Sequence, residues 1–127
     1  MNKYHARKTE CKQGHKHDSG REAQFCAELR LREIAGDIDS YEVNKKYQLQ
    51  PGFQMKPIDQ KHIHPWRQRG EAVRAINYIA DFVVKHSDGM TEVIDVKGMQ
   101  TDAFKIKWKL LQYLYRESAS VILTIVN

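Results

Sequence analysis

The chain has 127 residues and a formal net charge of +5, with 21 lysines and arginines against 16 acidic residues. This length predicts a single domain, residues 1–127, with a core of its own. The positive charge favours phosphate-bearing partners, although charge alone does not establish nucleic-acid binding. Because the sequence shows no signal peptide and no membrane-length apolar run, we expect no membrane partner, and two cysteines predict a cytoplasmic protein with reduced thiols.

A basic, polar segment, residues 1–18, begins the chain. The run Arg7–His17 has Gln13-Gly14 at its middle, which suits the turn of a small hairpin. Four residues of this region invite a zinc-binding interpretation: Cys11, His15, His17 and Cys26. Their spacing is not that of a standard zinc module, and Cys26 falls inside a helical pattern. A polar hairpin is therefore the favoured interpretation.

A helix is predicted from Ser19 to about Ala35, where Gly36 provides a C-terminal stop. Ser19 and Glu22 have the spacing of a capping box. Glu22 also belongs to an apolar stripe of this helix, with Phe25, Cys26 and Leu29. Glu22 is therefore either a capping residue or a carboxylate that faces the sheet and serves a site. The local pattern alone favours capping.

Tyr41–Leu49 predicts a strand of mixed polarity, with Asp37 and Asp39 as turn residues at its start. A long loop or insertion, residues 50–70, follows and contains all three prolines of the chain. It combines cations with an aromatic side chain, a mixture that suits nucleic-acid contact through Lys61, Trp66, Arg67 and Arg69. An ordinary solvated loop is an equally good interpretation.

Glu71–Lys85 predicts a long central strand, apolar on both faces, with Asp81 in the middle of its apolar run. A bare carboxylate there is costly unless a cation compensates it. Asp88-Gly89 predicts a hairpin turn into a second strand within Thr91–Gly98. Adjacent strands lie about 4.8 Å apart, so the fold-back brings Asp81 close to Asp95, where the two carboxylates could share one divalent ion.

The second strand of this hairpin ends in a polar pair. Side chains alternate along a strand, which places Asp95 and Lys97 on one face and Ile94 and Val96 on the other. A solvated strand face could carry the same pair for solubility alone. The position before Gly98, between apolar residues, favours a site.

Thr101 predicts the cap of a second helix, about Asp102–Glu117. Its apolar stripe is typical of core packing and consists of Phe104, Trp108, Leu111 and Tyr115. Lys105 and Lys107 could reach nucleic-acid phosphates, although a solvated face is the default. A closing buried strand, Ser120–Val126, completes the order helix, strand, strand, strand, helix, strand, which predicts an α/β fold with one mixed sheet.

Several ordered segments carry a family resemblance. They are Asp18-Ser19-x-x-Glu22, Gly36-x-Ile38, Tyr47-x-Leu49, Asn77-Tyr78-x-x-Asp81-Phe82, and Asp95-Val96-Lys97-Gly98 with Thr101-x-x-Phe104-x-x-Lys107. This set resembles the PD-(D/E)XK nuclease superfamily, and more narrowly a phage- and prophage-encoded family within it. Two positions depart from the pattern: Ala80 stands where the superfamily has proline, and Asn44 where we expect a glutamine.

The resemblance implies a restriction-endonuclease-like αβββαβ core and a metal-dependent DNA endonuclease of phage recombination or replication. Asp81, Asp95, the Val96 carbonyl and Glu22 would hold Mg²⁺ or Mn²⁺, and Lys97 would position the attacking water. With the family in view, a site role for Glu22 becomes the favoured one. Relatives of this size include dimeric Holliday junction resolvases, so the resemblance implies branched DNA as the substrate, a homodimer as the assembly and the host cytoplasm as the location.

Three alternatives remain open on the sequence. A basic DNA-binding accessory module could keep this fold without cutting. A zinc-stabilised interaction protein could use the cysteines and histidines near the N-terminus. A nuclease of the same class could act on RNA instead of DNA.

Overall fold

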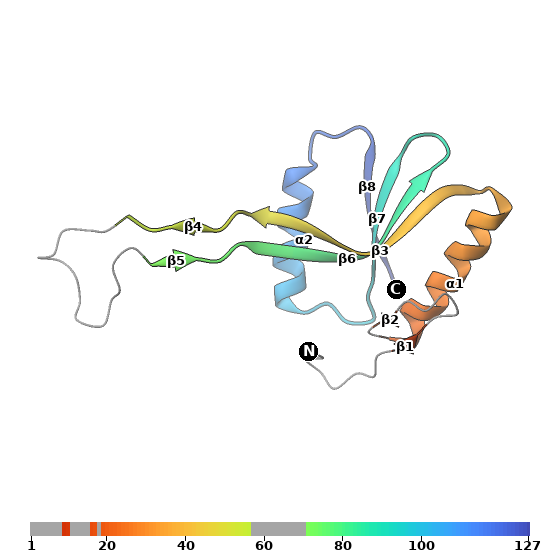
Figure 1. Ribbon diagram of the computed structural model, residues 1–127, viewed down its shortest axis with the longest axis horizontal. Helices are drawn as coiled ribbons and strands as arrows, with labels where there is room; N and C mark the ends of the chain where they lie inside the picture. The colour runs from red at the N-terminus through yellow and green to blue at the C-terminus, as the bar shows by residue number, and fades with distance from the viewer. Residues whose placement is uncertain (1–8, 11–15, 18, 57–70) are drawn as a thin grey trace, which may run out of the picture.

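The computed structural model describes residues 9–10, 16–17, 19–56 and 71–127 (Figure 1). The longer elements follow the predicted order: α1 (Gly20–Ala35), β3 (Ile38–Gln50), β6 (Ile76–His86), β7 (Thr91–Val96), α2 (Asp102–Leu114) and β8 (Val121–Val126). The described chain also has short strands of two residues each: β1 (Thr9–Glu10), β2 (Lys16–His17), β4 (Phe53–Gln54) and β5 (Ala72–Val73).

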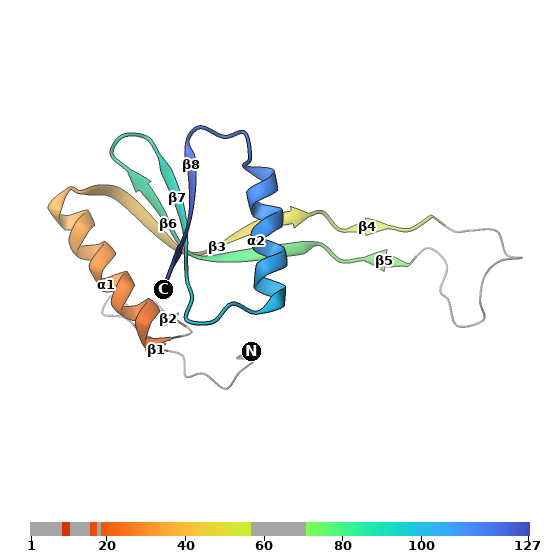
Figure 2. The ribbon, with the colours of Figure 1, turned by 180° about the vertical axis from the view of Figure 1, so that it is seen from behind.

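The longer strands form one four-stranded sheet in the order β3-β6-β7-β8. The β3–β6 and β6–β7 pairs are antiparallel, whereas β7 and β8 are parallel, with α2 as the crossover between them. Figures 1 and 2 show α1 and α2 on opposite sides of this sheet. The prediction of an α/β fold with a mixed sheet flanked by helices is confirmed.

Each helix buries its apolar stripe against one face of the sheet. The cluster under α1 includes Leu29, Phe82 and Ile94, and the cluster under α2 includes Val93 and Trp108. Val93 and Ile94 are neighbours in β7, and their side chains enter opposite clusters because successive strand residues point to opposite faces. Burial on both faces explains the nearly continuous apolar runs of β6 and β7.

The long strand β3 changes the helix that it faces near its middle. Tyr41 and Val43 pack against the cluster under α1, whereas Tyr47 and Leu49 pack against the cluster under α2. Asn44 lies between these pairs with φ of 56°. Asparagine tolerates this left-handed conformation better than most residues. Because the backbone is irregular at Asn44, the side chains of β3 before and after it can pack against different helices.

The ends of α1 are formed as the sequence predicts. The Ser19 Oγ accepts the backbone N–H of Glu22 at 3.1 Å. At the other end, Gly36 adopts φ of 81°, and the N–H of Asp37 donates to the carbonyl of Arg32. This left-handed C-terminal turn satisfies carbonyls that the helix itself leaves unpaired.

Gly36→Ala is expected to lower the free energy of unfolding by about 1 kcal/mol, because a side chain in the left-handed region costs roughly that much. Nothing lies within 4 Å of the added Cβ, so conformation and not crowding sets the cost. Urea unfolding measures the change. Gly20→Ala is the matched control, since an added Cβ there also meets nothing within 4 Å and its φ is not in the left-handed region. An equal loss in both variants would contradict the conformational explanation.

Other local predictions are also confirmed. The N-terminal hairpin is present as the antiparallel β1–β2 pair. In the β6–β7 turn Gly89 has φ of 91°, and the Asp88 carboxylate accepts the N–H of Met90 at 2.9 Å. The Thr101 hydroxyl caps α2 by accepting the N–H of Phe104. The predicted end of this helix at Glu117 is wrong, because α2 ends at Leu114.

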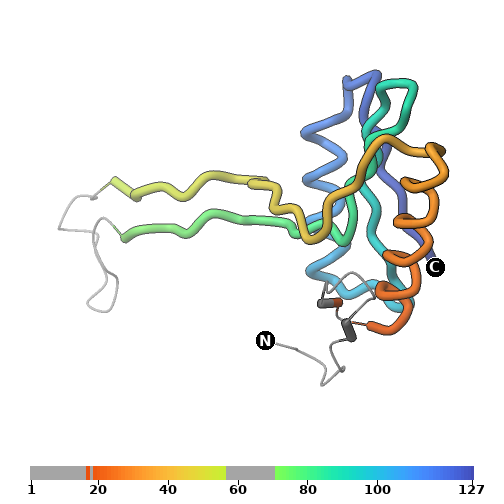
Figure 3. Tube along the Cα trace, turned by 45° about the vertical axis from the view of Figure 1, so that its right-hand side comes forward, coloured from red at the N-terminus to blue at the C-terminus, as the bar shows by residue number. Residues whose placement is uncertain are grey.

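The region after β3 differs most from the prediction. Residues 50–70 are not all loop, because β4 lies in this range and pairs with β5. The single strand predicted over Glu71–Lys85 is interrupted at Arg74–Ala75, between β5 and β6. The result is a two-stranded arm that continues the β3–β6 ribbon away from the body, as Figure 3 shows. A further correction concerns Asp39, which lies inside β3 and not in a turn.

Candidate metal and catalytic site

Asp95 lies near the end of β7 and is only 1% exposed. The Tyr78 hydroxyl donates a hydrogen bond to its Oδ2. Its Oδ1 lies 3.2 Å from the Lys97 Nζ but accepts no hydrogen bond from any described residue. Asp95 is therefore a buried carboxylate with one oxygen fixed by Tyr78 and the other facing a cation.

Asp81 reaches the same place from β6. Phe82 of β6 pairs with Ile94 of β7. One residue further toward the end of β7, Asp95 therefore lies across from Asp81. The Asp81 Oδ2 accepts the backbone N–H of Val96 at 2.7 Å. Asp81 also lies opposite the irregular residue of β3, and irregular strand positions often re-aim a side chain toward a site.

Glu22 completes the acidic group from α1. It is 6% exposed, and its charge acts on the Asp81 carboxyl. Its backbone N–H donates to the capping Ser19 Oγ, and its carboxylate is buried and acts on Asp81, as the interpretation of an inward-facing carboxylate expects. We call Glu22, Asp81, Asp95 and Lys97 the acid–lysine cluster.

The charges of this cluster are unbalanced. Burial, the Asp95 carboxylate and the Glu22 carboxylate raise the pKa of Asp81 to about 8. The hydrogen bond from Val96 and the charge of Lys97 oppose this rise without cancelling it. Two other buried carboxyl groups and one amine thus act on Asp81, an imbalance of charge that an added cation would relieve.

Lys97 is held between its acidic partner and an aromatic ring. Its Nζ lies 3.2 Å from the Asp95 Oδ1 and 4.8 Å from the centre of the Phe104 ring. The side chain is 29% exposed, so the amine is open to solvent on one side. Lys97 and Asp95 share one face of β7, as alternation predicts. Its position lets the amine contact a ligand that approaches the cluster.

The donor set fits a hard divalent cation in its chemistry. Carboxylate oxygens are the ligands that Mg²⁺ prefers, and the Asp95 Oδ1 is buried without a hydrogen bond from the described part of the chain. One oxygen each of Asp81 and Asp95 is already bonded, to Val96 and Tyr78 respectively. Across the described ranges, no three acidic, histidine or cysteine side chains already stand in a ligand arrangement. Binding of a metal ion by three of these side chains would therefore need the carboxylates to move.

Tyr78 is the site residue that sequence reasoning missed as a contributor. It is buried, and its ring packs edge-on against Trp108 with centroids 5.9 Å apart. Burial and the Asp95 charge raise the pKa of the Tyr78 hydroxyl far above its ordinary value, so it acts as a donor. In the sequence, the indication of a site role for Tyr78 is that it lies three residues before Asp81 in the same strand, since a buried carboxylate needs a hydrogen-bond donor.

Tyr78→Phe is expected to weaken Mn²⁺ binding by about 10- to 100-fold, because the hydroxyl orients the Asp95 carboxylate. A calorimetric titration of Mn²⁺ measures this. Tyr47→Phe is the control, since Tyr47 packs edge-on against Tyr115 under α2 and its hydroxyl is not the one that bonds Asp95. Unchanged Mn²⁺ affinity in the Tyr78 variant would rule out this positioning role.

The residues predicted to contact nucleic acid are placed only in part. Lys105 is exposed on α2, and Lys107 is half-buried on the same helix. The other four, Lys61, Trp66, Arg67 and Arg69, lie outside the described residues. Val96 was predicted to bind the metal through its backbone carbonyl, and this stays a prediction. The structure shows that its N–H donates to Asp81 and that its side chain lies in the core under α1.

The zinc alternative can be examined for two of its four residues. His17 is buried, with its ring 5.6 Å from that of Phe82, and Cys26 is buried in the core under α1. The Cys26 Sγ lies 3.7 Å from the Tyr41 hydroxyl. Cys11 and His15 lie outside the described residues, so the four-residue zinc site stays untested.

The fold and the site together define an α/β domain with buried carboxylates and a lysine where the end of β7 lies beside the middle of β6. The chain belongs to the family described as "Protein of unknown function (DUF1064)", whose model matches residues 1–125. No curated protein matches the chain. Neither α1 nor α2, the helices of the described ranges, has the length and apolar character of a membrane span.

Proposed function

We propose that this protein is a metal-dependent nuclease of the PD-(D/E)XK superfamily that hydrolyses phosphodiester bonds in DNA. The observation that carries the proposal is the acid–lysine cluster itself. Asp81 and Asp95 lie on adjacent strands, and Lys97 is paired with Asp95 at 3.2 Å. A buried excess of carboxylates beside one amine is costly for stability alone, and it is the arrangement that binds a cation and a phosphate together.

The residues of the acid–lysine cluster have different roles in this proposal. Asp95, Asp81 and Glu22 would hold Mg²⁺ or Mn²⁺, and Tyr78 orients Asp95. When bound, the ion lowers the pKa of a water molecule and offsets charge on the scissile phosphate. Lys97 places its amine beside the reacting phosphate, where it offsets the negative charge that develops in the transition state. In hydrolysis the water oxygen bonds to phosphorus, one phosphorus–oxygen ester bond breaks, and the leaving oxygen takes up a proton.

The arm offers a surface for the rest of the substrate. Residues 51–75 carry five cations, Lys56, Lys61, Arg67, Arg69 and Arg74, against two acids, Asp59 and Glu71. A two-stranded β-ribbon fits the major groove of DNA, and basic side chains on it neutralise phosphates. We assign the arm, together with Lys105 and Lys107 of α2, to contact with DNA. The finer proposals are branched DNA as the substrate, a homodimer as the acting form and the host cytoplasm as the location.

A cleavage panel tests the proposed function. Purified protein is incubated with linear, flapped and four-way DNA and with single-stranded RNA, in Mg²⁺, Mn²⁺ or chelator. Metal-dependent cutting that is strongest on the branched substrates supports the proposal, and cutting that is confined to RNA would change the substrate. Tight DNA binding without cutting in Mn²⁺ would replace the nuclease by a non-cleaving accessory protein.

Lys97→Ala is expected to reduce this cleavage by about 100-fold or more while DNA binding is largely kept, because the amine acts on the transition state. Single-turnover cleavage rates measure the effect. Lys85→Ala is the control, since the Lys85 amine bonds Thr91 at the far end of the hairpin. Wild-type rates in the Lys97 variant would remove that residue from the mechanism.

A further inference from the structure

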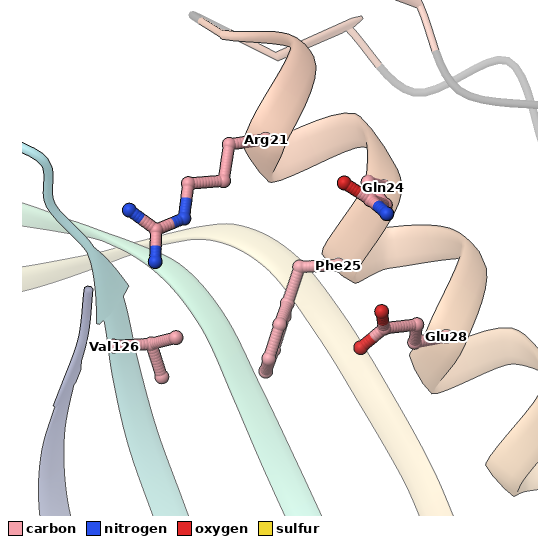
Figure 4. Close-up of a pocket in the computed structure, with 5 residues that line it drawn as sticks. All are labelled: Arg21, Gln24, Phe25, Glu28 and Val126. Atoms are coloured by element: carbon pink, nitrogen blue, oxygen red, sulfur yellow. The ribbon is translucent and has the colours of Figure 1, made fainter.

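A small cavity of about 220 Å³ lies beside α1, separate from the acid–lysine cluster. Its lining comes from one face of the helix and the end of β8: Arg21, Gln24, Phe25, Glu28 and Val126 (Figure 4). The four helical residues have the spacing i, i+3, i+4 and i+7, which puts them on one side of α1. Figure 4 shows the side chains of Arg21 and Phe25 projecting from the helix on the side of Val126.

This cavity adjoins the cluster through two elements. On α1, Arg21 directly precedes Glu22. In the sheet, Val126 pairs with Val96, whose N–H is bonded by Asp81. The backbone N–H of Lys97 donates to the carbonyl of Val126 at 2.8 Å. The cavity and the cluster are therefore formed by the same two elements of the fold, the start of α1 and the paired ends of β7 and β8.

The lining has two chemical parts. Phe25 and Val126 form an apolar floor, and the Phe25 ring is fixed against Phe82 with centroids 5.2 Å apart. The other lining residues are polar and exposed, with a cation in Arg21 and an anion in Glu28. These two charges are seven residues apart, or about 10 Å along the helix axis. An anionic group is thus favoured at the end near the cluster and disfavoured at the far end.

A nucleotide has this distribution of properties, with one phosphate at one end and a flat, partly apolar sugar and base at the other. The cavity of about 220 Å³ is smaller than the roughly 300–1,000 Å³ of a site that encloses a drug-sized ligand, so it would contact part of one such unit. Arginine binds phosphate with a planar, multidentate set of donors. Gln24 and the Glu28 carboxylate offer hydrogen-bonding groups to a base edge.

We propose that this cavity is a subsite for the nucleotide next to the scissile phosphate, with Arg21 as the residue that binds the flanking phosphate. The proposal rests on the proposed nuclease function and names a part of the substrate contact. Arg21 is a substrate-positioning residue in this account and takes no part in the bond-breaking step.

Arg21→Ala tests the subsite in the Asp95→Asn background, where binding is measured without cleavage. Fluorescence anisotropy with a labelled four-way DNA is recorded at several salt concentrations in chelator. We expect about a 10-fold weaker affinity and a salt slope reduced by about one, as for the loss of one phosphate contact. Arg21→Lys should recover part of the affinity, because it restores the charge without the planar donors.

Arg30→Ala is the matched control. It removes the same charge from α1, but nine residues further on and hence on the opposite face, where Arg30 pairs with Glu33 at 3.2 Å. Equal effects of the Arg21 and Arg30 substitutions, or no binding of DNA at all, would overturn the subsite.

Wild-type cleavage in Mn²⁺ is measured in parallel. Selective weakening by Arg21→Ala without any wild-type cleavage would keep Arg21 as a phosphate contact and reject the nuclease. Wild-type cleavage, with DNA binding that Arg21→Ala does not change, would keep the nuclease and reject the subsite.

Discussion

Asp95→Asn is expected to lower Mg²⁺-dependent DNA cleavage by about 1,000-fold while the fold is kept. The substitution removes the negative charge of a carboxylate that is 1% exposed, so the cluster loses the most buried of its proposed metal ligands. An asparagine oxygen can still accept the Tyr78 hydroxyl, which preserves the local packing. Single-turnover rates at saturating Mg²⁺ measure the effect, and circular dichroism follows the fold.

Asp102→Asn provides the control for this experiment. It changes the same side chain in the same way, but Asp102 is exposed in the first turn of α2. Its cleavage rate should stay within about twofold of wild type, as for a surface substitution without a site role. Full activity of the Asp95 variant, or equal activity with and without chelator, would show that the cluster is not the metal centre.

Asp81→Asn is expected to stabilise the metal-free protein above neutral pH by several kcal/mol. The pKa of Asp81 rises from 3.8 in the unfolded chain to about 8 in the folded one, so folding favours the protonated form. That favourable contribution is present below about pH 4 and is lost progressively as the pH rises to about 8. Asparagine does not ionise, so the difference between variant and wild type should grow by on the order of 1 kcal/mol per pH unit across this window.

Urea unfolding in chelator, at intervals from pH 4.5 to pH 9, measures this difference. The control is Asp39→Asn, because Asp39 is exposed in β3 and its substitution should change stability by no more than about 0.5 kcal/mol at any pH. Saturating Mg²⁺ should reverse the order of wild type and Asp81→Asn, since the ion favours the ionised carboxylate. A pH-independent difference between Asp81→Asn and wild type would mean that the folded and unfolded pKa values are alike.

Much of the fold follows from local signals that are strong in this chain. The serine and glycine at the ends of α1, the Asp88-Gly89 turn and the apolar runs of β6 and β7 each predict what the structure contains. The proximity of Asp81 and Asp95 follows from the same turn, because a hairpin fixes which residues face each other. These features depend on short-range geometry, which a single sequence carries.

The arm and the interruption of the strand at Arg74–Ala75 could not be predicted in the same way. The β4–β5 pair has no buried face, so its sequence lacks the alternation by which strands are recognised. The left-handed Asn44 depends on how β3 passes from one helix to the other, a property of the assembled layers. Tyr78 was missed as a site residue because a tyrosine in an apolar run is typical of core packing. Its hydroxyl bonds Asp95 only once the sheet has formed.

Binding of Mn²⁺ to the purified protein, followed by titration calorimetry near pH 8, tests the central claim most directly. The acid–lysine cluster predicts saturable binding in the wild type and its loss in both Asp95→Asn and Asp81→Asn, with Asp102→Asn unchanged. Wild-type protein that binds no Mn²⁺ at millimolar concentration, or variants that bind it as well as the wild type does, would contradict the existence of a metal centre where β6 and β7 meet.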